Sequence, residues 1–468
     1  MTQRLYDSRL QQLVDFAPLR AGEISMYVCG PTVQSAPHVG HLRSALVYDQ
    51  IRRWFVREGY RVTLVRNVTD IDDKTLANAT EHEPWWALAY RVEQDFTAAY
   101  RALRVQNPTY EPRATASIPE MQAIIATLIE RGHAYAAEDG SGDVYFDTAS
   151  WADYGELTHQ RPAEMEAAAD GVERAKRSPQ DFALWKGRKD DEPDSAAWAS
   201  PWGPGRPGWH IECSAMSTKY LGTAFDIHGG GLDLRFPHHE NELAQSRAAG
   251  HDFAQHWLHN GLISYGGTKM SKSIGNVVSA AGLLGERRPI VVRYLLGTAH
   301  YRSTIELSAD AYTEAEAAFG RIEGMLERAG RLGTVEVAAQ LPDAFVAAMR
   351  DDFGVPLATA CIHDAVTRAN QAMDADDAGN ALAEAASVRA MLDVLGLDPL
   401  ADEWADAAGT DVKLESALDA LVRDLLAQRA EARAAKDWAA ADRIRDALAG
   451  AGITIEDTPH GPHWSVTA

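Results

Sequence analysis

The chain has 468 residues, of which 46% are hydrophobic, and its formal net charge is −22. This length predicts several domains with sizeable cores, and we find no apolar run long enough to span a membrane. The acidic balance excludes a general affinity for nucleic acid, because the long-range field repels phosphate, so an RNA partner must be met by local basic patches.

The N-terminal segment and the cysteine content bear on the cellular compartment of the protein. The segment lacks the charged, apolar and small-residue pattern of a signal peptide, which predicts a cytoplasmic protein. Only three cysteines occur. A disulfide framework is therefore not expected, and metal binding or burial is the better expectation for each of them.

A strand–helix–strand pattern begins the chain. Residues 24–29 (ISMYVC) and 61–67 (RVTLVRN) are rich in β-branched and aromatic residues, which is typical of strands, and the residues between them keep helical spacing. Such a right-handed crossover places a ligand at the strand ends near the helix N-terminus. The unit lacks the G-x-G-x-x-G fingerprint, which disfavours nicotinamide binding.

Two histidines, His38 and His41, lie where this predicted helix begins. Histidines three residues apart are commonly capping or solvent-facing residues. At a helix N-terminus, however, two imidazole donors would strengthen the binding of a phosphate.

Residues 98–208 interrupt this pattern. They combine a helix at 118–132, a small strand pair near 144–147 and a polar loop at 188–208, which predicts an insertion between two halves of one nucleotide-binding domain. The second half, 209–280, contains a predicted helix at 209–222, a strand at 224–228, a helix at 240–249 and a strand at 257–265. The first half is 1–97.

The remainder of the chain is mainly helical. Residues 281–397 have the long helical periods of a bundle, 398–414 form an acidic linker, and 415–468 form a small module with a helical stretch and a strand pair. The predicted fold class is therefore α/β: a doubly wound, Rossmann-like domain with an insertion, followed by a helical bundle and a small C-terminal module.

A stretch from Asp226 to Glu242 contains metal-ligand types beside a glycine-rich turn. Pro237 is well placed to begin a helix, so His238 and Glu242 would share one helical face, whereas His239 would pair with an apolar Leu243. Tetrahedral zinc needs more than two ligands.

Two cysteines are candidates for the missing ligands. Cys29 ends the first strand, and because strand ends converge in a doubly wound sheet it could meet Cys213 across the switch point. Two thiolates, an imidazole and a carboxylate suit zinc. Each cysteine alone has the alternative interpretation of a small buried residue, which Cys361 keeps.

A lysine-bearing segment, KMSKS at 269–273, follows a Gly-Gly turn. Such a loop is usually only solvated. Two lysines and two hydroxyls on a turn are also what a negative charge migrating on a triphosphate requires.

Several motifs resemble a known family. Pro37 to His41 (PHVGH) is similar to the HIGH motif of class I aminoacyl-tRNA synthetases, with Val39 in place of isoleucine, and 269–273 matches KMSKS. The segments FDIHGGGLDL, FPHHENE and NVTDIDDK resemble the cysteinyl-tRNA synthetases, and Cys29, Cys213, His238 and Glu242 match the zinc ligands of that family. The resemblance runs from Met26 to Trp464.

This resemblance implies a cysteinyl-tRNA synthetase with one zinc ion, and with ATP, Mg²⁺, L-cysteine and tRNA(Cys) as its other partners. The zinc would take the substrate thiolate as a further ligand and reject serine, so we expect no editing domain. We also expect a monomer. The catalytic residues would be His38, His41, Lys269 and Lys272, and ATP would contact these together with Gly40, Gly230, Met270, Ser271 and Ser273. Cysteine would contact Gly30, Thr69, Asp70, Trp209 and Asp233, although a turn or capping role is the alternative for Thr69 and Asp70.

The same resemblance assigns the helical bundle to contact with the tRNA stem and 415–468 to the anticodon. There Trp438 could stack on a base, while Asp442 and Asp457 could accept from base edges; packing and solvation are the alternatives. Two groups of arginines could approach RNA: Arg423, Arg429, Arg433, Arg443 and Arg445 in the module, and Arg287, Arg288, Arg293 and Arg302 near the catalytic domain.

Two other functions share these motifs. A cysteine ligase of the mycothiol pathway passes activated cysteine to an amino-sugar, and it would have no use for residues 415–468. A zinc-stabilised RNA-binding protein derived from a synthetase is the non-enzymatic alternative, which the intact histidine, lysine and metal motifs disfavour.

Overall fold

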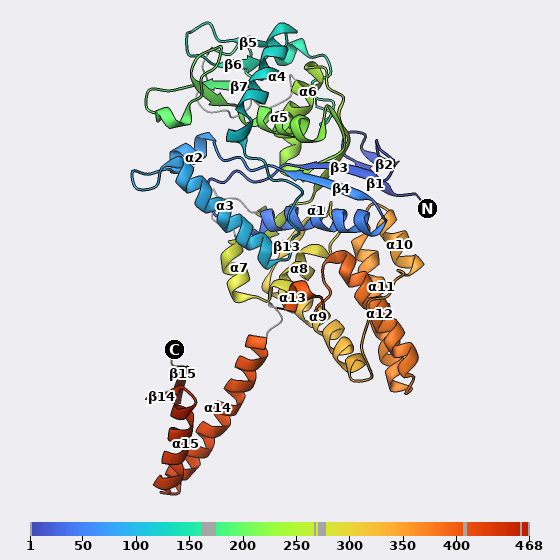
Figure 1. Ribbon diagram of the computed structural model, residues 1–468, viewed down its shortest axis with the longest axis vertical. Helices are drawn as coiled ribbons and strands as arrows, with labels where there is room; N and C mark the ends of the chain where they lie inside the picture. Colours follow the sequence, from blue (N-terminus) through green and yellow to red (C-terminus); the bar gives the residue numbers. More distant parts are fainter. Residues whose placement is uncertain are drawn as a thin grey trace. The chain divides into compact units, whose positions relative to one another are not determined.

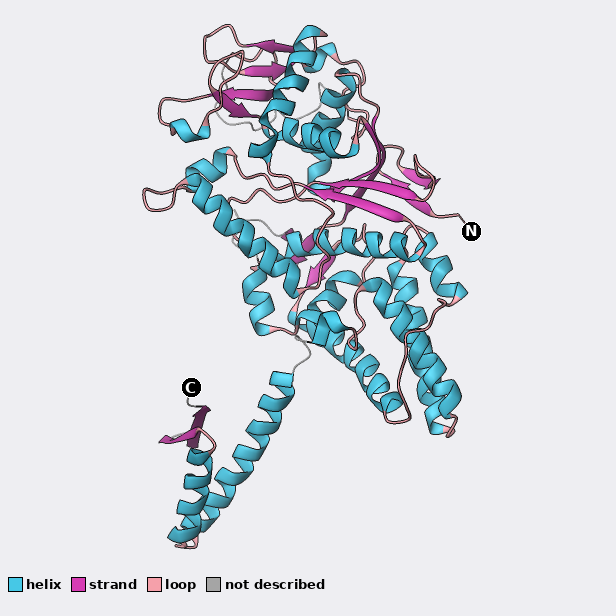
Figure 2. Cartoon of the chain, viewed as in Figure 1, coloured by secondary structure: helices cyan, strands magenta, loops and turns pink. Residues whose placement is uncertain are grey.

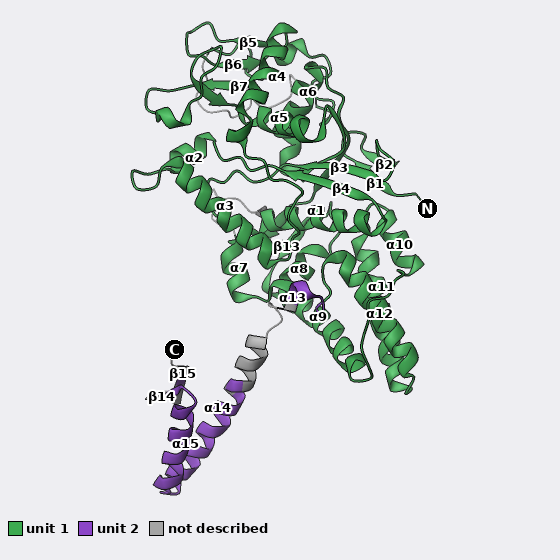
Figure 3. Cartoon of the chain, in the orientation of Figure 1, with its two compact units in different colours: residues 1–398 green, residues 399–468 purple. Residues whose placement is uncertain are grey.

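The computed structural model describes residues 2–160, 175–265, 268–269, 278–405, 410–458 and 461–466. Two compact units divide the chain, Met1–Asp398 and Pro399–Ala468 (Figure 3). None of the helices in these ranges combines the length and the apolar composition that crossing a membrane requires.

A four-stranded parallel sheet forms the centre of the first unit. Its strands are β3 (Glu23–Val28), β4 (Arg61–Arg66), β9 (Ala224–Gly231) and β10 (Phe253–Asn260), in the order β10-β9-β3-β4. The two halves of the fold meet where Met26 pairs with Leu64 on one side and with Ile227 on the other. The doubly wound α/β fold predicted from the sequence is confirmed.

Helices cover both faces of this sheet (Figure 1). On one face, α1 (Val39–Arg57) buries Leu42, Leu46 and Trp54. On the other face lie α5 (Trp209–Leu221) and α6 (Glu240–Ala248). Before α6 come the short turns η5 (Leu232–Leu234) and η6 (Arg235–His239).

The insertion carries its own antiparallel sheet, drawn above the parallel sheet in Figure 2. Its strands are β5 (Ala134–Ala136), β6 (Val144–Phe146), β7 (Phe182–Gly187) and β8 (Gly205–Pro207), and α4 (Ile118–Glu130) packs against α5. The sequence predicted only a strand pair here. The buried run FALWKG of β7 provides the missing pairing partner, and β8 stands inside the loop at 188–208 that was interpreted as polar.

The segments that join these layers are α2 (Asp73–Asn78), α3 (Trp85–Ala102) and the 3-10 turns η1 (Ala114–Ser117), η2 (Thr148–Ser150) and η4 (Asp194–Ala196). An N-terminal hairpin of β1 (Arg4–Asp7) and β2 (Gln12–Asp15) was not predicted, because each strand has only four residues.

The predicted strand over 257–265 is wrong as a single element. β10 ends at Asn260, and β11 (Ile263–Tyr265) joins a second small sheet with β12 (Thr268–Lys269) and β13 (Ile305–Leu307). Gly261 lies at the break, where a Cβ atom would come within 2.3 Å of the Ser303 carbonyl oxygen. The chain therefore passes too close to its neighbour for a continuous strand with side chains.

The region after this sheet is helical, with α7 (Ala280–Glu286), α8 (Pro289–Gly297), α9 (Ala309–Gly330), α10 (Asp343–Arg350), α11 (Val355–Asp374) and α12 (Ala378–Leu395). These helices agree with the predicted bundle, apart from the short strand β13, which is too brief to show a period.

The second unit contains α13 (Asp402–Ala405), α14 (Thr410–Ala434), α15 (Trp438–Gly450), β14 (Ile453–Thr458) and β15 (Gly461–Val466). Two of these helices, α13 and the start of α14, occupy part of the predicted linker. The core of the second unit consists of Val422, Leu426, Leu448 and Ile453, with Trp464 packed against them. The helical stretch breaks at Lys436, whose φ is 60°, and Asp437 then caps α15 by accepting from the Ala440 amide.

Candidate active site

A cavity of about 470 Å³ lies at the carboxyl ends of the parallel strands. Its lining combines residues that the sequence singled out in distant segments: Cys29, Gly30, His38, Gly40, His41, Trp209 and Asp233. In a doubly wound sheet this is the edge at which ligands bind. The topology, rather than any local motif, therefore brings these residues together.

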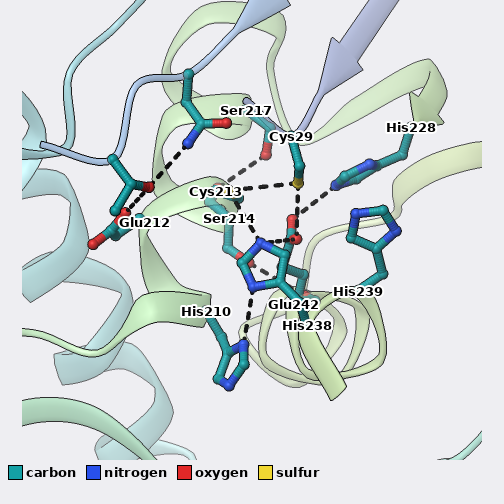
Figure 4. A network of polar contacts seen from close by, with 12 residues as sticks. Cys29, His210, Glu212, Cys213, Ser214, Ser217, His228, His238, His239 and Glu242 are labelled. Carbon is teal, nitrogen blue, oxygen red and sulfur yellow. Dashed lines mark hydrogen bonds and ion pairs between the residues drawn. The ribbon is translucent and has the colours of Figure 1, made fainter. Parts of the chain in front are cut away.

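A buried cluster of metal-ligand types adjoins this cavity at Cys29 (Figure 4). Ligand atoms of Cys29, Cys213, His238 and Glu242 all lie within 4.8 Å of one another. The two Sγ atoms are 3.6 Å apart, and Glu242 Oε1 lies 3.3 Å from Cys29 Sγ and 3.0 Å from His238 Nε2. Three elements supply the set: the end of β3, helix α5, and the η6–α6 segment.

The donor set fits a divalent zinc ion. Two thiols, one imidazole and one carboxylate are the ligand types and number of a tetrahedral zinc site. All four side chains are buried, and burial raises the pKa of Cys29 and raises that of Cys213 to about 11. A bound cation reverses this effect, because it stabilises the thiolate directly.

Neighbouring groups orient the ligands. His210 Nδ1 lies 3.0 Å from His238 Nδ1, which leaves Nε2 of His238 facing the cluster. Burial lowers the pKa of both histidines to about 3, so the rings are neutral and one of the two Nδ1 atoms donates to the other. The His238 ring also stacks on Trp209 at 4.1 Å between centroids. Such outer contacts fix the tautomer of a metal-bound histidine.

The sequence analysis did not assign two further histidines at the cluster, His228 and His239. His228 Nε2 lies 2.8 Å from Glu242 Oε2, and Cys29, His228, His239 and Glu242 form a second set of four ligand atoms within 4.8 Å. Every residue of β9 from Phe225 to Gly231 is buried, so the strand pattern did not single out His228. His239 was set aside because its helical partner Leu243 is apolar, an argument that ignored ligands from other elements.

The two histidines of the PHVGH motif stand at the start of α1. His38 is the N-cap and accepts from the Gly40 amide at 3.2 Å, while His41 Nδ1 accepts from the His38 amide at 3.1 Å. Their rings stack at 3.7 Å. The reciprocal pair is a capping box built from imidazoles, and it holds both rings at the cavity wall.

The predicted cysteine-binding residues fall into two groups. Gly30, Trp209 and Asp233 line the cavity. Thr69 and Asp70 are buried outside its lining: Thr69 Oγ1 donates to Glu212 at 2.6 Å, and Asp70 accepts from Thr115, where η1 begins. The contact of Asp70 is therefore with a residue 45 positions away, and the local cap after β4 is Asp72, at the start of α2.

Gly230, predicted to contact ATP, has its amide donating to the Tyr48 hydroxyl at 2.6 Å, and Tyr48 in turn donates to the Leu258 carbonyl. Of the KMSKS segment, the backbone of Lys269 lies in β12, whereas its side chain and residues 270–273 are outside the described residues.

In the second unit, Trp438 is 60% exposed and Asp442 forms an exposed ion pair with Arg445 at 3.1 Å. The side chain of Asp457 is outside the described residues. Arg423, Arg433, Arg443 and Arg445 are exposed, and Arg429 is half-buried.

The prediction that Arg293 approaches RNA is wrong. This side chain is fully buried, and its guanidinium donates to Asp49 and to the Leu103 and Leu395 carbonyls. Arg302 pairs with Asp352 and Arg288 with Glu323, and Arg287 lies over the Tyr312 ring. A count of arginines in sequence does not distinguish a structural guanidinium from a surface one.

Comparison with known proteins agrees with this geometry. Residues 15–317 match the family described as the class I (C) catalytic domain of tRNA synthetases, 344–400 match the DALR domain, and 415–464 match the cysteinyl-tRNA ligase anticodon binding domain. The cysteine–tRNA ligase of Clavibacter sepedonicus is 62% identical over 100% of this chain and 99% of the relative. The chain belongs to the cysteine–tRNA ligase family of class I tRNA synthetases.

Other relatives agree. The cysteine–tRNA ligase of Micrococcus luteus is 58% identical over 99% of both chains. A solved structure of Mycobacterium tuberculosis methionyl-tRNA synthetase with methionyl-adenylate has a TM-score of 0.57 at 16% identity, and the match covers 81% of this chain and 90% of that one. At this identity the likeness shows a shared fold alone.

Proposed function

We propose that this chain activates L-cysteine with Mg-ATP and transfers it to the 3′ end of tRNA(Cys). One observation carries the proposal: the buried set of Cys29, Cys213, His238 and Glu242 adjoins a cavity that both histidines of the PHVGH motif also line. A thiol-selecting metal site beside a phosphate-binding motif is what recognition and activation of cysteine require.

The reaction has two steps. The carboxylate of cysteine attacks the α-phosphorus of ATP, which forms cysteinyl-adenylate and releases pyrophosphate. The 2′-hydroxyl of the terminal ribose then attacks the carbonyl carbon, and AMP leaves. Positioning and charge stabilisation supply the rate, and no side chain needs to act as a covalent nucleophile.

Cys29, Cys213, His238 and Glu242 would hold zinc, which would supply a Lewis acid for the substrate thiolate and reject the harder hydroxyl of serine. His210 and His228 would hold His238 and Glu242 in their orientations through the contacts described above. His38 and His41, with Lys269 and Lys272, would stabilise negative charge on the phosphates, and Met270, Ser271 and Ser273 would complete the ATP contacts.

The acceptor distinguishes this proposal from the amino-sugar alternative. A small acceptor has no use for an anticodon-reading module, and residues 415–464 match such a module. We therefore favour tRNA(Cys), with Trp438, Asp442 and Asp457 at the anticodon. We also expect a monomer, which light scattering would report as a mass near the 51.0 kDa of one chain.

Cysteine-dependent exchange of pyrophosphate into ATP tests the activation step, and incubation with either tRNA(Cys) or an amino-sugar tests the acceptor. Absence of exchange would contradict the proposed activation of cysteine. A product formed only with the amino-sugar would contradict the proposal that tRNA is the acceptor. For the metal, Cys213→Ser should lose both stoichiometric zinc and cysteine affinity. Cys361→Ser, which changes a half-buried cysteine of α11, is the matched control and should lose neither.

A further inference from the structure

Lys74 lies at the wall of the cavity, at the start of α2. Besides the two histidines of the PHVGH motif, the cations that the described part of the chain contributes to this wall are Arg66 and Lys74. Arg66 is paired with Glu111 at 2.7 Å and lies over the Tyr100 ring. Lys74 is exposed and has no ion pair among the described residues. Asp72 and Asp233 line the same cavity, so Lys74 is the lysine of this wall that an anion could engage beside these carboxylates.

A set of ion pairs fixes the neighbouring residue. Asp73 accepts from Lys186 Nζ at 2.6 Å and from Arg206, and Arg206 also binds Glu192 at 2.8 Å. We call Asp73, Lys186, Arg206 and Glu192 the Asp73 clamp. Arg206 is 2% exposed. A guanidinium this deeply buried and bound on both sides holds its partners in one geometry.

The clamp joins two parts of the fold. Lys186 and Arg206 stand on β7 and β8 of the insertion. Asp73 is the first residue of α2 and lies between Asp72 and Lys74, which both line the cavity. Asp72 also caps α2, because its carboxylate accepts from the Lys74 amide at 2.9 Å. A second contact joins the start of α3 to the insertion, where Trp85 Nε1 donates to Ser195 Oγ at 3.1 Å.

The charges of the clamp balance one another. Partial burial would raise the pKa of Asp73, but Lys186 and Arg206 lower it below its ordinary value. Two carboxylates therefore face two cations, and none of the four is available to neutralise Lys74. The insertion thus holds in place the turn from which Lys74 and Asp72 line the cavity.

We propose that Lys74 binds a phosphate group of the substrates and that the Asp73 clamp positions it. The inference rests on the proposed function, because that function supplies two phosphate sources at this cavity: the triphosphate of ATP and the terminal phosphodiester of the tRNA 3′ end. The chemistry recognised is the same in both cases, a phosphate oxygen accepting from an ammonium.

The test compares Lys74→Gln with Lys74→Arg and with Lys219→Gln. Lys219 forms an ion pair with Glu120 on the surface, outside the cavity lining, so its substitution controls for the loss of one positive charge. Pyrophosphate exchange at varied ATP gives one readout. Single-turnover transfer from protein-bound cysteinyl-adenylate to tRNA(Cys) gives the other. Exchange by the unmodified chain tests the proposed function independently of every variant.

We expect Lys74→Gln to lower kcat/KM by about tenfold or more, the usual loss for a hydrogen bond to a charged group, with Lys74→Arg retaining more activity. A raised KM for ATP in exchange identifies the triphosphate as the ligand. Normal exchange with slower and less salt-sensitive transfer identifies the RNA phosphate. If both readouts match those of Lys219→Gln, or if Lys74→Arg loses as much as Lys74→Gln, the proposal is overturned.

A double-mutant cycle tests the clamp. Asp73→Asn alone should reduce the same readout as Lys74→Gln, whereas in the Lys74→Gln background it should have little further effect. Asp73→Glu, which keeps the charge, should restore part of the loss. Additive losses in the cycle would show that Asp73 acts on structure rather than through Lys74, and the positioning role would then be refuted.

Discussion

Asp49 is the buried carboxylate that joins the helix after the PHVGH motif to the helical region. It lies on α1 and is 2% exposed. Its Oδ2 accepts from Arg293 at 2.5 Å and from Arg53 at 3.0 Å, and its Oδ1 accepts from the Gln106 amide at 2.8 Å. Asp49→Asn keeps the size of the side chain but removes its charge and turns one acceptor into a donor.

The loss of unfolding free energy in Asp49→Asn depends on the arginine charges that stay buried without their counterion. Removing one partner of a buried ion pair costs about 3–5 kcal/mol, because the other charge stays buried without its counterion. Arg293 keeps hydrogen bonds to the Leu103 and Leu395 carbonyls, which partly stabilise its charge. We therefore expect a loss near the lower end, about 3 kcal/mol in the free energy of unfolding.

Urea unfolding followed by tryptophan fluorescence measures this loss, with Asp351→Asn as the control. Asp351 makes the same type of pair, with Arg4, but its side chain is 54% exposed, so its substitution should cost less than about 1 kcal/mol. Equal unfolding curves for the two variants would refute the argument from burial.

The difference in unfolding free energy between the unmodified chain and Asp49→Asn should depend on pH. Burial would raise the pKa of Asp49, but Arg293 and Arg53 lower it below its ordinary value. A depressed folded-state pKa gives stability that is fully present above the unfolded-state value, about 3.9 for aspartate, and is lost as pH falls through the folded-state value. The difference between the unmodified chain and Asp49→Asn should thus persist at pH 7 and narrow below about pH 4. A difference that stays constant from pH 7 to 3 would contradict the assignment.

Three further changes have defined outcomes. Tyr48→Phe leaves the Gly230 amide without the hydroxyl that it contacts at 2.6 Å, so we expect about 1–3 kcal/mol less stability by urea unfolding; an unchanged midpoint would contradict this. Gly30→Ala would place a Cβ atom 1.7 Å from the Asn67 carbonyl oxygen, so it should lose pyrophosphate exchange, whereas Gly285→Ala, with open space around it, should keep it. Trp438→Ala should raise KM for tRNA(Cys) and leave exchange unchanged, and equal effects on both would remove the anticodon role.

Topology and local periodicity account for only part of the metal cluster. Helical spacing places His238 and Glu242 on one face, where their side chains lie 3.0 Å apart. Strand topology places Cys29 at the end of β3, but Cys213 reaches it from helix α5 and not from a strand end. His228 and His210 could not be assigned in this way. Each acts through one contact from a different element, and such a contact depends on side-chain packing that has no sequence period.

Short elements limit the prediction of the fold in the same manner. A three-residue strand such as β13 or β8 forms because a neighbour offers its backbone, so its own residues carry little signal. Arg293 shows the corresponding limit for charge, since the residues that bury it come from α1, the end of α3 and the end of α12.

The glycines at the end of β9 are better explained by packing than by a bound phosphate alone. A Cβ atom at Gly229 would lie 2.3 Å from the Tyr48 ring, and one at Gly230 would lie 2.8 Å from the His239 ring. Tyr48 belongs to the helix that carries the PHVGH histidines, and His239 adjoins the metal cluster. The absence of side chains at these two positions therefore lets the helix and the cluster approach the same strand end. The distance between the PHVGH motif and the cluster of metal-ligand types is set there, by contacts within the protein.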